Sequence, residues 1–525
     1  MQTAYDLVYM SAQRSPDHLA LVDDRSPLQF TYAQLIEEID AIAAGLWQRG
    51  VRPGMFVATI LGNGIEHSVA LLALSRIGAV PALLNLRLAT PDLVKLTEQG
   101  ELKGAIIHKQ PELAAALAAA LPANAPKLCA GGAVGTFEDF AACRGDAKIL
   151  PPPPKPHPDA PAFIFYTSGT TGLPKGGIIP HRASEHRIIW LATQAGIRFG
   201  THNRALGFMP LSHCVGFYGV FLVTLGFNGT FYVMTMFEPA ACLDAIEKHK
   251  ITFTFAVPTH YHAMTLAPNY SPAKVQSLQH VLYGAAPIEP ALVNKMAAEW
   301  KATIRHIYGT TETMCSLYHP EPVPTPNQLR PGFYSNTRVI KIGGGPDDRV
   351  KPGEEGEVIV DATADTIFTG YLNRPDATAE KLRGKWYYSG DVAELHDNGD
   401  LTLRGRVDDM IRSGGESIHP EEVEAALANH PGIKELSVVG VTDTRWGQIV
   451  VAVVVRKDPA LNGAALDAHC KSSTLAAYKR PKAYFFVDVP LPRNVTNKVL
   501  RRVLRDQALA ARTANAENFQ IVGKI

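Results

Sequence analysis

An eleven-residue stretch at 166–176, Tyr-Thr-Ser-Gly-Thr-Thr-Gly-Leu-Pro-Lys-Gly, has the composition of an anion-binding loop. It follows a short apolar run at 162–165 that predicts a buried strand. Small side chains let backbone N–H groups and hydroxyls approach a ligand, and Lys175 adds positive charge. The order Pro-Lys-Gly excludes a Walker A loop. The stretch predicts a polyphosphate site, with a flexible linker as the alternative. The candidate ligand positions are Thr167, Ser168, Gly169, Thr170, Thr171, Gly172 and Lys175.

Three further segments carry residues that suit a nucleotide. Tyr-Gly-Thr-Thr-Glu at 308–312 joins an aromatic face, hydroxyls and a carboxylate, which suits a metal–nucleotide ligand; a capped strand–helix turn is the alternative. Asp391 could accept hydrogen bonds from two vicinal hydroxyls or could cap a turn. Lys498 precedes an amphipathic run from Val499, where a cation opposes the helix dipole. A residue that departs from a local structural preference in this way tends to mark a functional site, although a solvated surface lysine is the default interpretation of Lys498.

The elements that must position these residues alternate between helix and strand. Helical spacing at 32–49 and 69–77, with strands at 57–61 and 82–84, is the βαβ rhythm of a parallel sheet. Arg87 follows the second of these strands, where such a sheet has its ligand crevice.

The alternation continues to about residue 345. Predicted strands at 205–209, 253–257, 281–283 and 304–307 each end in a small or polar cluster, so we expect these ends to converge on one crevice. Short strands with Gly, Pro and Asp turns at 346–404 predict a small barrel-like unit. A helix from Pro420, strands at 436–441 and 449–455, and a last helix from about 499 predict a small α+β domain.

Composition excludes several classes of protein. The 525 residues are too many for one core, and 46% are apolar and 19% charged. Net charge is +1, which leaves no footprint for nucleic acid or an anionic membrane. The uncharged segment 214–237 contains an Asn-Gly turn, so it predicts a buried helix, a turn and a strand rather than a membrane span. The six scattered cysteines, with no signal-peptide pattern, predict a cytoplasmic protein.

Together these motifs resemble, over nearly the whole chain, those of the adenylate-forming superfamily of acyl-CoA synthetases, adenylation domains and luciferases. The resemblance is closest to bacterial aryl-CoA ligases of the 4-chlorobenzoate:CoA ligase type. It implies that ATP with Mg²⁺ activates a carboxylic acid as an acyl-adenylate and that CoA then takes the acyl group. It also implies an α/β fold with a large N-terminal domain at 1–405, including parallel-sheet subdomains and the barrel-like subdomain. A hinge at 406–409 and a small mobile C-terminal domain at 410–525 complete that architecture.

The resemblance gives roles to individual residues. Tyr308 would stack on adenine, Thr311 would contact the α-phosphate, and Glu312 would help to hold Mg²⁺. Lys498 would be the adenylation lysine and Asp408 the hinge residue. The implied ATP-binding positions outside the loop are Gly284, Ala285, Tyr308, Gly309, Thr310, Thr311, Glu312, Asp391 and Arg406. The implied CoA-binding positions are Arg87, Gly414, Gly415, Trp446 and Arg480.

The acyl pocket that the resemblance implies is formed by Trp190, His213, Val215, Phe255, Gly284, Ile307, Gly309, Met314 and Cys315. Apart from His213 these residues are apolar or weakly polar, which predicts a neutral, flat or apolar acyl tail. His213 would pack near the carboxylate, with a structural core histidine as the alternative. Trp190 and Cys315 replace the Phe and Asn of the chlorobenzoate type, which argues against chlorobenzoate itself. The expected acid is another para-substituted benzoate or an arylpropenoate.

Other functions remain open at this point. A medium-chain acyl-CoA synthetase would use the same chemistry, and an adenylating enzyme could load a carrier protein instead of CoA. An oxygenase of luciferase type and a non-catalytic nucleotide-binding protein are further alternatives. The expected partners are the acid, ATP and CoA, with neither nucleic acid nor a membrane span, and a homodimer is compatible with the sequence.

Overall fold

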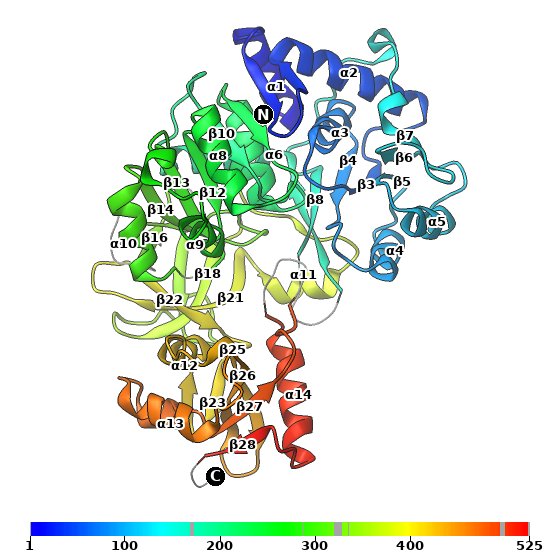
Figure 1. Ribbon diagram of the computed structural model, residues 1–525. Helices are drawn as coiled ribbons and strands as arrows, with labels where there is room; N and C mark the ends of the chain where they lie inside the picture. Colours follow the sequence, from blue (N-terminus) through cyan, green and yellow to red (C-terminus); the bar gives the residue numbers. More distant parts are fainter. Residues whose placement is uncertain are drawn as a thin grey trace. The chain divides into compact units, whose positions relative to one another are not determined.

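The computed structural model describes residues 2–167, 173–286, 288–319, 328–333, 335–493 and 499–522. Its contacts divide the chain into two compact units. Unit 1 holds the described parts of Met1–Thr167, Leu173–Thr337 and Val360–Tyr387. Unit 2 includes the described parts of Arg338–Ile359 and Tyr388–Ile525. Figure 1 colours the chain from blue to red along the sequence.

One sheet of unit 1 has the strand order β19-β9-β8-β4-β3-β5-β6-β7. Its strands are β3 (Phe56–Ile60), β4 (Val80–Leu83), β5 (Gly104–His108), β6 (Lys127–Ala130), β7 (Glu138–Asp139), β8 (Pro161–Thr167), β9 (Lys175–Pro180) and β19 (Gly370–Tyr371). β3 pairs in parallel with β4 and β5, and β4 pairs in parallel with β8. The chain that leaves β4 and the chain that leaves β8 therefore emerge at the same edge, as the βαβ rhythm predicted.

The second sheet of unit 1 has the order β16-β15-β14-β13-β12-β10-β11-β1-β2. Its strands are β1 (Leu19–Asp23), β2 (Gln29–Thr31), β10 (Arg204–Gly207), β11 (Thr230–Val233), β12 (Phe253–Ala256), β13 (His280–Gly284), β14 (Thr303–Tyr308), β15 (Leu317–Tyr318) and β16 (Gln328–Pro331). Pairing is parallel from β14 through β13, β12 and β10 to β11. The carboxyl ends of β12, β13 and β14 consequently meet at one edge, where the sequence placed its candidate residues.

Helix α2 (Tyr32–Gln48) shows why these segments fold as they do. Its apolar residues recur at helical spacing and are buried, as at Leu35, Ile39 and Ile42. The Thr31 hydroxyl accepts from the Gln34 backbone N–H while the Gln34 side chain accepts from the Thr31 N–H, a capping box that fixes the start. The other helices of unit 1 include α1 (Ala4–Arg14), α3 (Ile65–Arg76), α4 (Thr90–Gln99), α5 (Pro111–Ala120), α6 (His181–Ala195), α8 (Pro239–His249), α9 (Pro258–Thr265), α10 (Pro290–Glu299) and α11 (Pro375–Lys381).

The uncharged segment 214–237 folds as a helix, a turn and the buried strand β11, as predicted. The helix differs from an ordinary α-helix because Val215–Leu222 is π-helical before α7 (Val223–Gly226). A β-carbon at Gly216 would lie 2.0 Å from the Pro210 carbonyl oxygen, so the close approach requires glycine. Within the described residues, no helix combines the length and hydropathy needed to span a bilayer.

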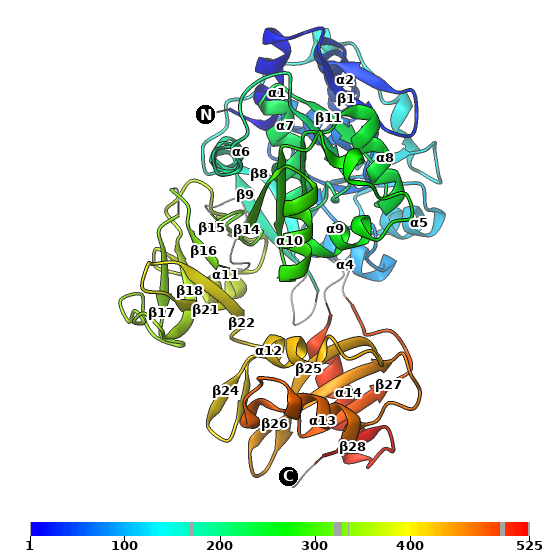
Figure 2. The same cartoon turned by 60° about the vertical axis from the view of Figure 1, so that its left-hand side comes forward.

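Unit 2 contains a sheet with the order β24-β23-β26-β27-β28, with β25 paired to β26. Alternate side chains of β26 point to opposite faces: Val450 packs in the cluster that includes α12 and α13, whereas Val451 packs in the cluster that includes α14. Figure 2 shows these helices around the sheet. The elements are β23 (Ile411–Ser413), β24 (Glu416–Ile418), α12 (Pro420–Leu427), β25 (Ile433–Asp443), β26 (Gly447–Arg456), α13 (Gly463–Ser472), β27 (Ala483–Val487), α14 (Arg501–Thr513) and β28 (Phe519–Ile521).

Unit 2 also includes antiparallel strands that precede this sheet. β21 (Trp386–Leu395) pairs with β22 (Leu401–Arg406), and β18 (Glu355–Asp361) and β17 (Thr337–Ile340) continue the same ladder. The contact-based unit thus groups 388–405 with the C-terminal residues. The functional division at 406–409 stays a prediction.

Candidate active site

Residues from three distant segments of unit 1 are linked through the side chain of Tyr371. β9 begins at Lys175, and its pairing with β19 places Tyr371 opposite Gly177. The Lys175 Nζ lies 5.5 Å from the centre of the Tyr371 ring, and the Tyr371 hydroxyl donates to Glu312 Oε1 at 2.6 Å. Glu312 is 6% exposed. The structure thus brings Lys175, at the end of the predicted anion-binding loop (166–176), close to the segment 308–312, here called the adenylate motif.

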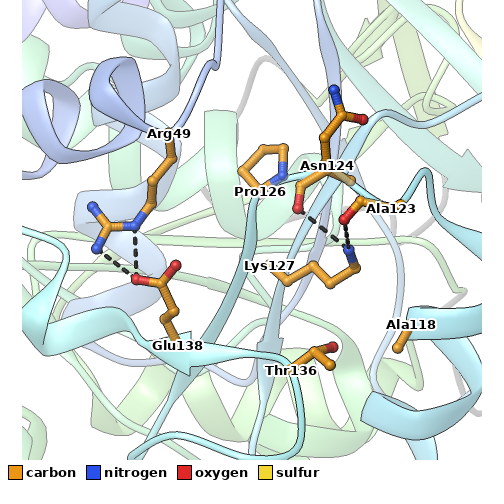
Figure 3. A pocket seen from close by; sticks show the side chains of 9 residues that line it. Arg49, Ala118, Ala123, Asn124, Pro126, Lys127, Thr136 and Glu138 are labelled. Atoms are coloured by element: carbon orange, nitrogen blue, oxygen red, sulfur yellow. Dashed lines mark hydrogen bonds and ion pairs between the residues drawn. The ribbon is translucent and has the colours of Figure 1, made fainter.

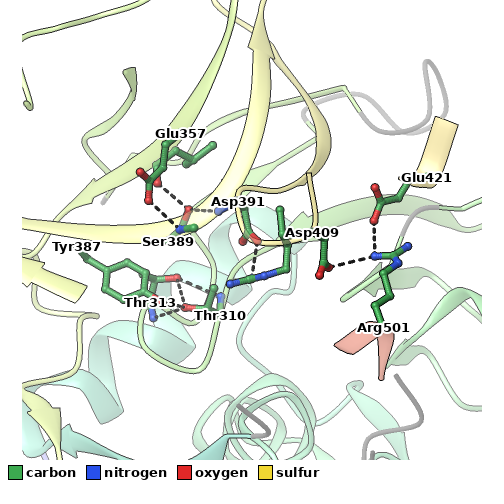
Figure 4. A network of polar contacts seen from close by, with 12 residues as sticks. Thr310, Thr313, Glu357, Tyr387, Ser389, Asp391, Asp409, Glu421 and Arg501 are labelled. Atoms are coloured by element: carbon green, nitrogen blue, oxygen red, sulfur yellow. Dashed lines mark hydrogen bonds and ion pairs between the residues drawn. The ribbon is translucent and has the colours of Figure 1, made fainter. Parts of the chain in front are cut away.

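The segment 308–312 leaves β14 in a tight turn. The Thr310 backbone N–H donates to Thr313 Oγ1 at 3.2 Å, and the Thr310 hydroxyl lies 3.4 Å from the Tyr387 hydroxyl (Figure 4). A β-carbon at Gly309 would lie 1.7 Å from the Met314 carbonyl oxygen, so this approach excludes any side chain. Met314 itself has a φ of 63°, a strained value for a side chain of its size. Backbone strain of this kind concentrates at functional sites.

Gly284 and Ala285 follow the neighbouring strand, β13. Gly284 is paired with Ile307 of β14, and a β-carbon at Gly284 would lie 2.4 Å from the Ile307 carbonyl oxygen. Ala285 has a φ of 65°, in the left-handed region. The structure therefore places Gly284 and Ala285, two of the implied ATP-binding positions, directly beside the strand that leads to Tyr308.

Arg187 of α6 lies beneath this motif and was not predicted from the sequence. Its side chain is fully buried, and its guanidinium donates to backbone carbonyl oxygens rather than to a carboxylate. Nε bonds Thr366 at 2.8 Å, and Nη2 bonds Thr311 at 3.1 Å and Glu312 at 3.3 Å. Nη1 lies 3.4 Å from the Cys214 sulfur. Arg187 therefore fixes the backbone that carries Glu312.

The predicted acyl-pocket residues fall largely within one buried apolar cluster of unit 1. Trp190, Phe255, Ile307, Met314 and Cys315 belong to that cluster. Val215 packs against the same cluster. His213 follows β10, and its Nδ1 accepts from the Val215 backbone N–H at 3.3 Å. These positions agree with an apolar wall, while their role in binding an acid stays a prediction.

Trp190 is held in a closely fitted place on α6. It is 1% exposed and packs edge-on against Tyr318, with ring centres 6.3 Å apart. A β-carbon at Gly332 would lie 2.4 Å from the Trp190 ring, so glycine at this position makes room for the indole. Nothing bonds the indole Nε1 in the described part of the chain.

Thr167 and Arg87 lie at the edge where β8 and β4 end. The Thr167 hydroxyl donates to the Lys175 carbonyl oxygen at 3.3 Å across the loop. Arg87 is exposed, and burial together with the charge of Arg87 lowers the pKa of His260 to about 4. The remaining predicted loop residues, Ser168, Gly169, Thr170, Thr171 and Gly172, lie outside the described residues.

In unit 2, Asp391 and Arg406 face each other across the β21–β22 pair. The Arg406 Nη1 donates to Asp391 Oδ1 at 2.7 Å (Figure 4). The Asp391 backbone N–H donates to Ser389 Oγ at 3.0 Å, and that hydroxyl donates to the Val358 carbonyl oxygen. Asp408, two residues beyond β22, is exposed.

The predicted CoA residues of unit 2 include one direct contact. The Gly414 backbone N–H donates to the Trp446 carbonyl oxygen at 2.9 Å, and a β-carbon at Gly414 would lie 2.8 Å from the indole ring. Gly415, next in sequence, has a φ of 90°. Lys482 Nζ lies 4.3 Å from the centre of the Trp446 ring, a cation that sequence reasoning missed. Arg480 is half-buried, with its Nε bonded to the Leu475 carbonyl oxygen at 3.3 Å.

Lys498 lies outside the described residues, but Arg501, three residues later, does not. Arg501 opens α14 and binds three carboxylates: Asp409 at 3.2 Å, Glu421 at 2.7 Å and Glu424 at 2.8 Å. Figure 4 shows Arg501 between Asp409 and Glu421. Arg501 is therefore tied to Asp409, within the predicted hinge at 406–409.

Glu312 is the group best suited to a magnesium ion. In the described part of the chain, no cationic side chain lies within 4 Å of its carboxylate, and a buried charge without a partner is costly. Nor do the described residues contain a cluster of three or more His, Cys, Asp or Glu that could hold a metal. Magnesium in nucleotide sites is bound through one or two carboxylates plus substrate phosphates and water, which fits this arrangement.

A separate surface hollow in unit 1 has a volume of about 460 Å³ (Figure 3). Both of its basic side chains are already bound, since Arg49 pairs with Glu138 at 2.6 Å and Lys127 Nζ donates to the Pro122 and Ala123 carbonyl oxygens, each at 3.1 Å. Its lining residues, all in the described part of the chain, include none of the predicted site positions.

Sequence reasoning missed Arg187 and Tyr371. Arg187 lies three residues before Trp190 on the same face of α6. A charged residue on an otherwise apolar helical face was therefore the sequence signal that could have indicated its role. Tyr371 joins the site through the pairing of β19 with β9, a contact between residues nearly two hundred positions apart. No local pattern reveals such a contact.

The chain belongs to the AMP-binding enzyme family: residues 8–372 match that family, and residues 422–498 match the AMP-binding enzyme C-terminal domain. A 4-chlorobenzoate–CoA ligase of Arthrobacter sp. is 41% identical over 532 residues, covering 99% of this chain and 97% of the relative. A feruloyl-CoA synthase of Amycolatopsis sp. is 34% identical, covering 90% and 93%. The o-succinylbenzoate CoA synthetase of Bacillus subtilis in complex with ATP and magnesium ion is 26% identical, covers 96% of this chain and 100% of that one, and gives a TM-score of 0.82.

Proposed function

We propose that this chain is an AMP-forming acid:CoA ligase that activates an aryl carboxylate with ATP and then forms its CoA thioester. The observation that carries the proposal is the meeting of Lys175, Tyr371 and Glu312 at the ends of two predicted nucleotide motifs. A chain that is 41% identical throughout to a 4-chlorobenzoate–CoA ligase supports the same chemistry.

The first reaction is adenylation. The substrate carboxylate attacks the α-phosphorus of ATP and pyrophosphate leaves, so the protein must position the two reactants and neutralise charge. Lys175 and the loop donors would face the departing phosphates, Thr311 the α-phosphate, and Glu312 a magnesium ion. Magnesium, when bound, supplies positive charge to the phosphate oxygens. Arg187 keeps the Thr311–Glu312 backbone in register during this step.

The second reaction is transfer of the acyl group to CoA. The thiol attacks the acyl-adenylate carbonyl and AMP leaves. Lys498 serves the first reaction. Rotation of residues 410–525 about the hinge at 406–409 would then move Lys498 away from the acyl-adenylate and bring Gly414 and Gly415 to the path by which the CoA thiol enters. Trp446, Arg480 and Arg87 would bind the nucleotide part of CoA; Trp446 already carries a cation, Lys482, on its ring face.

The acid is an aryl carboxylate with a neutral tail, such as a para-substituted benzoate or an arylpropenoate. Trp190, Phe255, Ile307, Met314 and Cys315 form a continuous buried apolar cluster, which suits a flat ring. Burial raises the pKa of the Cys214 thiol beside Met314 to about 11, so this sulfur stays neutral near the tail.

We also propose that the protein works in the cytoplasm on these small molecules, with a homodimer left as a prediction. All six cysteines are buried and free, which suits a reducing compartment.

One assay tests the function: AMP formation from ATP, measured with a panel of acids and with or without CoA. We expect turnover that requires both an aryl acid and CoA. A preference for medium-chain aliphatic acids would replace the aryl proposal. Turnover with a phosphopantetheinyl carrier protein but not with CoA would identify a carrier-loading enzyme, and no AMP with any acid would refute the ligase.

A further inference from the structure

The hydroxyl of Tyr371 makes a short, buried contact with the only carboxylate of the adenylate motif. Tyr371 is 7% exposed, and its hydroxyl lies 2.6 Å from Glu312 Oε1. The phenol O–H donates to the carboxylate oxygen as a charge-assisted hydrogen bond.

The backbone of Tyr371 is fixed independently of this contact. Its N–H donates to Thr378 Oγ1 at 2.9 Å, and β19 pairs with β9 through Gly177 and Ile178. Gly370 before it has a φ of 141° and lies against Thr378, where a β-carbon would approach within 2.9 Å. The position of the hydroxyl is thus set by the sheet rather than by Glu312.

Glu312 is anchored at both ends. Its carbonyl oxygen accepts from Arg187 at 3.3 Å and from the Phe368 backbone N–H at 2.8 Å. Among the described residues, its carboxylate accepts a hydrogen bond only from Tyr371, through Oε1. A neutral donor on one oxygen orients the carboxylate and leaves Oε2 as an acceptor, whereas a cationic partner would cancel its charge.

We propose that Tyr371 is a positioning residue that orients Glu312 toward the divalent cation of the nucleotide, and that its ring seats Lys175 beside the same phosphates. This inference rests on the proposed function, since it assumes that the ligand is a magnesium–nucleotide complex. It assigns to Tyr371 a role that neither the loop motif nor the adenylate motif contains.

The test compares Tyr371→Phe with the wild type and with Tyr261→Phe. Tyr261 is a matched control, because its fully buried hydroxyl also makes a short hydrogen bond, 2.7 Å to the Leu282 carbonyl oxygen, away from the motif. Two quantities are measured: the rise in melting temperature that ATP causes with Mg²⁺ or with EDTA, and the Mg²⁺ concentration for half-maximal pyrophosphate release at saturating ATP.

For Tyr371→Phe we expect that Mg²⁺ concentration to rise about tenfold, as expected for loss of a hydrogen bond to a charged group. The Mg²⁺-dependent part of the ATP stabilisation should shrink, while the part seen in EDTA and the KM for the acid stay close to wild type. Tyr261→Phe should lower the melting temperature of the ligand-free protein without changing its Mg²⁺ dependence.

Equal Mg²⁺ dependence in Tyr371→Phe and Tyr261→Phe overturns the inference and leaves the proposed function intact. A wild type that is stabilised by Mg²⁺-ATP but releases no pyrophosphate with any acid overturns the proposed function, and the melting measurement then still decides the role of Tyr371. A wild type that Mg²⁺-ATP does not stabilise at all overturns the inference itself.

Discussion

Replacing Arg187 by methionine should slow adenylation as well as destabilise the fold. Methionine keeps much of the buried volume but removes three hydrogen bonds from a charged donor, to the carbonyl oxygens of Thr366, Thr311 and Glu312. Two of these three carbonyls belong to the residues proposed to face the α-phosphate and the magnesium ion. The substitution therefore weakens the backbone support of the adenylate motif without removing a group that would contact a ligand.

The magnitude follows from these contacts. Hydrogen bonds to charged groups contribute roughly 1.5–3 kcal/mol each, so three bonds amount to roughly 5–9 kcal/mol before the cost of burying the guanidinium is subtracted. A buried carbonyl oxygen that loses its donor typically costs about 1–3 kcal/mol of stability. For activity, a displacement of about 1 Å at a reacting centre lowers the rate about 100-fold. That loss corresponds to about 2.7 kcal/mol of transition-state stabilisation.

Arg182 on the same helix provides the control. Its guanidinium bonds the carbonyl oxygens of Asp365 at 3.1 Å and Ile367 at 3.2 Å, so it holds the segment on either side of Thr366 but does not bond the adenylate motif. Pyrophosphate release and melting temperature are measured for Arg187→Met, Arg187→Lys and Arg182→Met. We expect kcat/KM to fall about 100-fold for Arg187→Met and less than tenfold for Arg182→Met.

Arg187→Lys separates a positioning effect from failure to fold. An ammonium group keeps the charge but cannot span Thr366 and the motif together, so we expect a folded protein with an intermediate rate. If Arg187→Met folds and its kcat/KM lies within threefold of the kcat/KM of Arg182→Met, Arg187 does not position the adenylate motif.

Three further predictions test the moving parts. Lys498→Ala should lower pyrophosphate release by about 100-fold or more, yet spare thioester formation from supplied acyl-adenylate; equal loss in both half-reactions would contradict this. Asp408→Pro should stiffen the hinge, keep pyrophosphate release within about threefold and lower thioester formation by at least about tenfold, and full turnover would exclude the rotation. Burial raises the pKa of Glu421 above its ordinary 4.5, and Arg501 opposes that shift. The contribution of Glu421 to folding stability is therefore present below pH 4.5 and is lost as the pH rises through the raised pKa. Arg501→Met should therefore cost about 2–4 kcal/mol of local stability at pH 7 and less at pH 5, as measured by hydrogen exchange in α12. The control is Arg505→Met, because the Arg505 side chain is 44% exposed. A loss of stability that does not depend on pH would argue against the carboxylate cluster.

Much of the fold could be predicted because its elements are locally determined. The helix expected at 32–49 is observed as Tyr32–Gln48, since its apolar spacing and its cap lie in the same short segment. The helix from Pro420 begins where expected, because proline is favoured at the first helical turn. The strands at 253–257 and 304–307 appear as Phe253–Ala256 and Thr303–Tyr308.

The rest depends on tertiary contacts that no local pattern encodes. The helix at 214–226 was predicted only as a helix, whereas Val215–Leu222 is π-helical and Gly216 lies close to the Pro210 carbonyl oxygen. The last helix was expected from about 499 and begins at Arg501, where the guanidinium binds three carboxylates. Lys175 and Glu312 could each be identified by motif, but their meeting through Tyr371 required β19 to pair with β9.

The two buried charges under the adenylate motif are arranged so that neither cancels the other. Arg187 directs its donors to backbone carbonyls, and a neutral phenol, not a cation, bonds the Glu312 carboxylate. A direct ion pair between Arg187 and Glu312 would satisfy both groups and remove the need for a cation at this position. Because the described residues give the Glu312 carboxylate no cationic partner, the proposed magnesium–nucleotide ligand would supply the missing positive charge. Replacing Tyr371 by a residue that brings its own charge, as in Tyr371→Lys, should therefore weaken the Mg²⁺ dependence of ATP binding more than Tyr371→Phe does.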